Sequence, residues 1–71
     1  MDFTEEELRE ARRQIGSTLH KLRETRKTLQ AKVGRCKPQI TLAERRIRAF
    51  EIADFLIGRE LQAFERGREE I

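Results

Sequence analysis

The segment GRCKP, residues 34 to 38, constrains the fold of this chain most, because it is the only strong interruption between two long helical patterns. Gly34 favours the end of a helix, since glycine readily adopts the left-handed backbone conformation found there. Pro38 suits the first turn of a following helix, where its missing N–H is not needed. Two long helices joined by a short loop form an αα-hairpin. The sequence therefore predicts one all-α domain over residues 1–71, an antiparallel two-helix hairpin that reverses direction at residues 34–38.

The first helix is predicted over about residues 4–33, and its start is well marked. Thr4 can act as the N-cap, and Glu7 stands three residues later, which completes a capping box. Phe3 and Leu8 have the spacing of a hydrophobic staple around that cap. The acidic residues at positions 5 to 7 also suit the positive end of the helix dipole.

The apolar residues of this first helix recur at steps of three, four or seven. At 100° per residue they form a stripe only about 80° wide, as in the seam of a coiled coil. Thr18 and Thr25 interrupt the stripe beside its centre. Its members are Leu8, Ala11, Ile15, Leu19, Leu22, Leu29 and Val33.

The second helix is predicted over about residues 39–66, with its start at Pro38 or with Thr41 as the cap, and with Gly67 as the stop and a short C-terminal tail. Its apolar residues span an arc of about 180°, where a surface helix needs roughly 100°, and Ile47 and Phe55 are expected outside that arc. The arc comprises Leu42, Ala43, Ala49, Phe50, Ile52, Ala53, Leu56, Ile57, Leu61, Ala63 and Phe64. Gly16 and Gly58 lie at similar distances from the turn, so they indicate either a close backbone approach or glycines that the helices simply tolerate.

A narrow stripe cannot cover so wide an arc, and an apolar patch left in water usually marks an interface. A second copy is the simplest partner, because two-fold dimers are the commonest soluble oligomers. Two hairpins joined in this way form a four-helix bundle with a coiled-coil type of packing. The alternatives are a different protein on the same face, or a compact monomer with a third short helix. The expected oligomer interface comprises Phe50, Ile52, Ala53, Leu56, Ile57, Leu61 and Phe64.

The size of the chain also favours association. A domain of 71 residues has a thin margin of stability unless a disulfide, a metal or a partner supports it. One cysteine excludes an internal disulfide, and one histidine with one cysteine makes a poor zinc site. We expect no membrane span, because no apolar run approaches 18 residues. We expect no signal peptide, because the N-terminus opens with acidic residues and lacks an apolar segment. The unpaired cysteine fits a reducing compartment, so we predict a cytoplasmic protein.

Charge divides the chain into a basic middle and acidic ends. Residues 21–48 carry a net charge of +8, whereas residues 1–20 carry −2 and residues 49–71 carry −3. The basic turn end of the hairpin could hold nucleic-acid phosphates, could orient self-association, or could serve only as a solvated surface. No helix-turn-helix, zinc finger or aromatic RNA-binding motif accompanies these charges. The candidate phosphate contacts are Arg26, Lys32, Arg35, Lys37, Arg45, Arg46 and Arg48.

No residue pattern in the sequence predicts catalysis, so we expect no enzyme, no cofactor, no metal and no small-molecule substrate. His20 is the only imidazole, and its one acidic neighbour within a helical turn is Glu24. Cys36 lies between Arg35 and Lys37, which could lower its thiol pKa, but we interpret it as an incidental loop cysteine rather than as a redox-sensitive or dimer-crosslinking thiol. We therefore interpret the protein as an interaction or structural module, with a nucleic-acid-binding accessory protein as the alternative.

Two stretches, STLHKLRETRKTLQAK and QITLAERRIRAFEIADFLI, resemble short bacterial proteins that are uncharacterised helical hairpins. Together the stretches cover about half the chain. The resemblance implies a helical-hairpin fold and no activity, cofactor or site.

Overall fold

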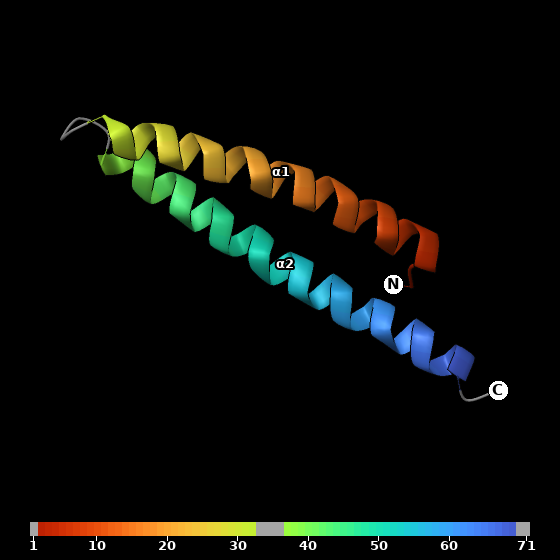
Figure 1. The fold of residues 1–71 in the computed structure, drawn as a ribbon. Helices are drawn as coiled ribbons and strands as arrows, with labels where there is room; N and C mark the ends of the chain where they lie inside the picture. Colours follow the sequence, from red (N-terminus) through yellow and green to blue (C-terminus); the bar gives the residue numbers. More distant parts are fainter. Residues whose placement is uncertain (1, 33–36, 70–71) are drawn as a thin grey trace.

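The computed structural model describes residues 2–32 and 37–69, and it contains two helices that pack along each other. Helix α1 spans Glu5–Ala31 and helix α2 spans Lys37–Glu69. They run antiparallel, with both termini at the same end of a rod measuring 57 × 18 × 17 Å, and α2 reaches beyond the start of α1 (Figure 1). The all-α hairpin predicted from the sequence is confirmed, and no strand occurs in the two described ranges.

The start of α1 is the predicted capping box. The Thr4 hydroxyl oxygen accepts a hydrogen bond from the Glu7 backbone N–H at 3.1 Å, and the Thr4 N–H donates to the Glu7 carboxylate at 3.1 Å. Two backbone donors at the helix N-terminus, which lack partners inside the helix, are satisfied in this way. The three acidic residues of the first turn stand at the positive end of the helix dipole, as expected.

Two predicted helix ends differ from the structure, whereas the start of α2 agrees with the prediction that places Pro38 in its first turn. Helix α1 ends at Ala31 rather than near residue 33, because the backbone of Lys32 is extended and its N–H donates to the Leu29 carbonyl, so Lys32 takes the C-cap role assigned to Gly34. Helix α2 begins at Lys37, so the alternative start with Thr41 as the cap is wrong. Of the predicted reversal at residues 34–38, Lys37 and Pro38 belong to α2, and residues 34–36 lie outside the described residues.

Gly67 does not stop α2, which continues to Glu69. A glycine inside a helix costs about 1 kcal/mol relative to alanine, and the helix-forming residues Glu65, Arg66 and Arg68 around it offset that cost. The side chain of Arg68 also pairs with Glu5, which ties the last turn of α2 to the first turn of α1.

The core of the hairpin is one narrow seam. Its buried side chains come from both helices, and no large side chain in the described residues is completely enclosed. The α1 stripe faces this seam as predicted, with Ala11, Ile15, Leu22 and Leu29 half-buried, while Val33 lies outside the described residues. The buried apolar residues are Leu8, Leu19, Ala43, Ile47 and Leu61.

Two residues of α2 belong to the core although the sequence analysis did not place them there. Ile47, which lies outside the predicted apolar arc, is only 3% exposed and is the most buried side chain of the core. Leu61, predicted in the oligomer interface, is 8% exposed and packs within the hairpin. The reason is the position of α1, which lies over the edge of the apolar arc rather than over its middle.

The two glycines near the middle of the helices have different surroundings. A Cβ added to Gly58 would lie 2.9 Å from Nη2 of Arg12, whereas nothing lies within 4 Å of a Cβ added to Gly16. A close approach of the two backbones is therefore not seen at either glycine: Gly58 lies against the Arg12 guanidinium, and Gly16 is a glycine that the helix tolerates.

Replacing each glycine by alanine separates these two situations. Gly16→Ala should raise the free energy of unfolding by about 1 kcal/mol, which is the difference in helix propensity. Gly58→Ala should raise it by less, because the new methyl group displaces the Arg12 guanidinium. Urea denaturation followed by circular dichroism measures both values. In an Arg12→Ala background the two substitutions should raise the free energy of unfolding by equal amounts. An equal increase for both substitutions in the wild-type background would contradict this explanation.

Candidate functional site

The two sides of the seam differ in chemistry, and one of them is lined by ion pairs between the helices. Nε of Arg12 lies 3.1 Å from Oδ1 of Asp54, and Nη2 of Arg23 lies 3.2 Å from Oε2 of Glu51. These side chains remain a third to a half exposed, so each pair contributes at most about 1 kcal/mol. The charged side chains of these pairs on this side of the hairpin therefore have their partners within one chain.

Asp54 interrupts a row of α2 residues that otherwise faces the core. Ile40, Ile47, Asp54 and Leu61 follow one another at intervals of seven, which places them on the same side of a helix in a coiled-coil arrangement. A carboxylate in such a row needs a partner, and Arg12 supplies it from α1. Gly58, one turn further along α2, leaves the space in which the guanidinium lies. Arg12, Asp54 and Gly58 thus form one contact between α1 and α2.

The other side of the seam is apolar and incompletely covered. Phe50, Ala53 and Ile57 are half-buried there, and Phe64 is 38% exposed. The neighbouring α1 positions on this side, Ala11 and Thr18, are too small to reach over them. The hairpin therefore has ion pairs on one side of the seam and partly covered aromatic and branched residues on the other.

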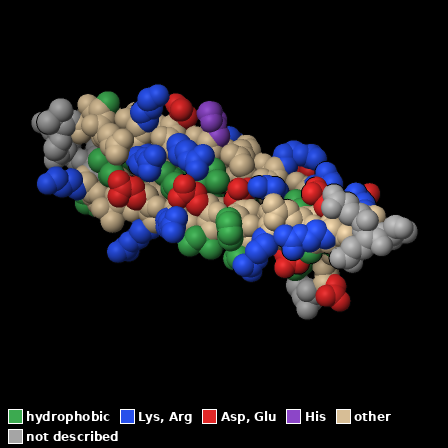
Figure 2. Space-filling view, turned by 60° about the horizontal axis from the view of Figure 1, so that its bottom comes forward, with side chains coloured by type: hydrophobic (Ala, Val, Ile, Leu, Met, Phe, Trp, Pro, Cys, Tyr) green, Lys and Arg blue, Asp and Glu red, His purple; other side chains and the backbone are tan. Residues whose placement is uncertain are grey.

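The apolar surface continues around the outside of α2. Leu42, Ile52 and Leu56 are each close to half exposed, at 48%, 48% and 44%. Phe55 is 66% exposed but points to the ion-paired side, about 100° around the helix from Leu56. Figure 2 shows one surface on which apolar side chains lie among basic and acidic ones along the length of the rod.

We call the apolar side of α2 that α1 leaves open the "open face". Six of the seven residues predicted for the oligomer interface lie on it or at its border and keep accessible surface, and Leu61 is the exception. The expected interface left out Leu42, Ala49 and Ala63, although the predicted apolar arc contains all three and their intervals of seven with Leu56 could have added them. The open face comprises Leu42, Ala49, Phe50, Ala53, Leu56, Ile57, Ala63 and Phe64, with Ile52 at its border.

The basic turn end does not form a single binding surface. Arg45, Arg46 and Arg48 are all exposed, yet they spread over roughly 150° of the circumference of α2. Arg26 is half-buried against the seam, Lys32 and Lys37 are exposed, and Arg35 lies outside the described residues. None of the ion pairs in residues 2–32 and 37–69 involves the described candidates. These charges are accessible to phosphates but converge on no pocket.

A shallow open groove between the helices is lined by Arg9, Arg12, Phe55, Arg59 and Arg66, with Asp54 and Glu65 beside them. Its carboxylates neutralise part of the basic charge, and the groove is open to solvent. His20 lies exposed on the surface of α1. No cluster of three metal-ligating side chains occurs among the residues that the structure describes.

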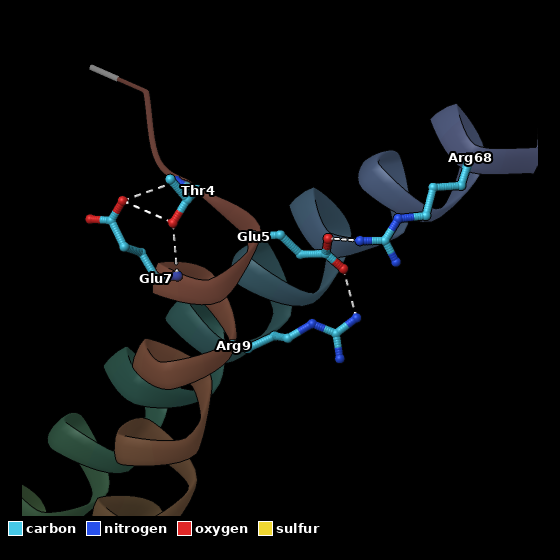
Figure 3. A network of polar contacts seen from close by, with 5 residues as sticks. All are labelled: Thr4, Glu5, Glu7, Arg9 and Arg68. Carbon is cyan, nitrogen blue, oxygen red and sulfur yellow. Dashed lines mark hydrogen bonds and ion pairs between the residues drawn. The ribbon is translucent and has the colours of Figure 1, made fainter.

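The open end of the hairpin carries the densest polar network (Figure 3). Glu5 bridges both helices, since its carboxylate accepts a hydrogen bond from Nη2 of Arg9 at 2.7 Å and another from Arg68. The hydrogen bond from Arg9 and the nearby charge of Arg68 hold the pKa of Glu5 below its ordinary value, although partial desolvation acts in the opposite direction. The same contact raises the pKa of Arg9.

Comparison of the chain with family models, with curated proteins and with solved structures found no significant match. The resemblance to uncharacterised bacterial hairpins therefore stays a prediction. No helix in the described part of the chain is long and apolar enough to cross a membrane.

The Glu5 network predicts a dependence of stability on pH. Because the pKa of Glu5 is lower in the folded chain than in the unfolded chain, the carboxylate stabilises the fold above the unfolded-state pKa, and this stabilisation disappears as the pH falls through the folded-state pKa. Glu5→Gln should therefore lower the melting temperature at neutral pH and narrow its difference from wild type in acid. Thermal melts from neutral to acidic pH test this, with exposed Glu6→Gln as the control, and a constant difference would contradict it.

Proposed function

We propose that this protein is a non-enzymatic protein–protein interaction or structural module that self-associates through the open face of α2 to form a four-helix bundle. The observation that carries the proposal is the exposure of large apolar side chains on one side of α2, with Leu42, Ile52 and Leu56 each close to half exposed. A contiguous apolar surface of this kind is typical of a contact with another protein.

The energetics favour a partner for this surface. The seam buries only five apolar side chains. Thr18 interrupts the apolar residues of α1 that face α2, and Asp54 interrupts those of α2 that face α1. Burying the remaining accessible area of four or five large side chains supplies roughly several kcal/mol at about 25 cal/mol per Å². That amount is comparable with the whole free energy of unfolding of a small domain. Self-association thus supplies the stability that the narrow seam lacks.

The arrangement of side chains also explains why a second copy is the proposed partner. The open face contains aromatic and branched residues with small alanines between them, which suits helix packing rather than a small ligand. A homodimer needs no other molecule, and charge separation along the hairpin gives each copy a basic and an acidic end. We place the module in the cytoplasm on the basis of its single, unpaired cysteine.

Leu56→Lys tests the self-association. Wild-type protein should sediment as a dimer at tens of micromolar, and the variant should sediment as a monomer or unfold, because an unpaired charge in an apolar contact costs several kcal/mol. Phe55→Lys is the matched control: it makes the same kind of change one residue away, outside the open face, and should leave the dimer intact. Sedimentation equilibrium over a concentration range measures the mass, and a wild-type monomer with a cooperative melt at high micromolar concentration would contradict the proposal.

The alternative is a nucleic-acid-binding accessory protein that uses the basic turn end, and the observation in its favour is the absence of ion pairs at the described candidate residues. Binding through phosphates should weaken with salt, with a logarithmic slope of about −0.9 per phosphate neutralised on duplex DNA. Changing Arg45, Arg46 and Arg48 together to Gln should flatten this slope and weaken all sequences alike. Fluorescence anisotropy with a random duplex at two salt concentrations provides the measurement. An absence of binding at about 50 mM salt would exclude this function.

A further inference from the structure

We infer that the second copy binds the open face of α2 in antiparallel orientation, about a two-fold axis that passes beside Ala53. This inference rests on the proposed self-association and adds to it the orientation, the alignment and the residue pairs of the contact. It follows from three rows of α2 residues, each with an interval of seven, that lie side by side along the open face. The central row also contains Arg46 and Glu60, two charged residues that lie between the apolar residues of that face.

The central row comprises Arg46, Ala53, Glu60 and Gly67. In an antiparallel pair of identical helices related by a two-fold axis beside residue 53, positions equally distant from it face each other. Arg46 and Glu60 stand seven residues before and after Ala53, so each Arg46 faces Glu60 of the second copy. Both side chains are exposed in the single hairpin, and neither takes part in an ion pair among the described residues.

The outer row comprises Leu42, Ala49, Leu56 and Ala63. The same axis places Leu42 near Ala63 of the second copy, and Ala49 near Leu56 of the second copy. Each large side chain therefore meets a small one, which lets two helices pack closely without overlap. The order large, small, large, small along this row is self-complementary only when the two helices run in opposite directions.

The row nearest α1 contributes the aromatic part of the contact. Phe50 and Ile57, both half-buried in the single hairpin, are placed opposite each other across the axis. At the centre Ala53 meets its own copy, and its methyl side chain allows a close approach of the two backbones. All three rows thus agree on the same alignment, although their residues differ in size and charge.

The extent of α2 and the distribution of charge support this alignment independently. Ala53 is the middle residue of α2, which has 33 residues, so two helices centred on it overlap along their whole length. The antiparallel orientation also places the basic residues 21–48 of one copy beside the acidic segments of the other. A parallel pair would instead bring Arg46 to Arg46 and Glu60 to Glu60, where like charges repel.

Two charge reversals test the orientation. Homodimers of Arg46→Glu and of Glu60→Arg each contain two repulsive pairs in place of two attractive ones, so each dissociation constant should rise about tenfold or more. A 1:1 mixture of the two variants should associate about as tightly as wild type, because both opposite-charge pairs are restored in the heterodimer. The double variant Arg46→Glu/Glu60→Arg should likewise form a homodimer. Arg48→Glu, which lies off the open face, is the control and should dimerise like wild type.

Sedimentation equilibrium measures association, and circular dichroism reports whether each variant is folded. If a single variant unfolds alone, the recovery of both helicity and dimer mass on mixing still supports the inference. If wild type is dimeric but the single variants associate normally, or the mixture shows no recovery, the antiparallel alignment is wrong while self-association stands. If wild type is monomeric at high micromolar concentration, the inference and the proposed function are both wrong.

Discussion

The structure depends on a difference in width between the apolar surfaces of its two helices. Helix α1 offers a narrow apolar stripe, and helix α2 offers a surface about twice as wide. Packing one against the other buries Leu8, Leu19 and Ile47 in a seam, but it leaves Leu42 and Leu56 close to half exposed. No rotation of α1 about α2 removes the excess, since a stripe of limited width covers only part of the arc. The hairpin by itself therefore leaves apolar surface of α2 accessible, and this surface is the basis of the proposed self-association.

The ion pairs between the helices and the open face lie on different sides of the seam. Arg12 reaches Asp54 across the seam, and Arg23 reaches Glu51 on the same side. Phe50 and Ile57 lie on the other side, where they are only half-buried. Gly58 leaves room for the guanidinium of Arg12. The energies of these half-exposed pairs are small, so they are consistent with the alignment of the helices while the buried apolar side chains hold the seam together.

This division accounts for the proposed role better than the basic turn end does. The apolar residues of α2 gather on one continuous surface, whereas Arg45, Arg46 and Arg48 point in several directions around the helix. A surface that gathers chemically similar groups can recognise a partner, while dispersed charges give only a nonspecific attraction. In the proposed dimer Arg46 has a defined function, because it pairs with Glu60 of the second copy and helps to select the antiparallel orientation.

The sequence by itself determined the two helices, the cap at Thr4 and the first-turn position of Pro38, because these follow from local hydrogen bonding and backbone geometry. It also determined the excess of apolar surface on α2, because that excess follows from the positions of the apolar residues around the helix axis. Only the tertiary structure decided which edge of the arc α1 covers, and hence that Ile47 and Leu61 belong to the core. The continuation of α2 past Gly67 was likewise beyond local rules. An ion pair between Arg68 of α2 and Glu5 of α1 connects the last turn to the other helix. These outcomes depend on contacts between residues far apart in the chain, which no local spacing pattern contains.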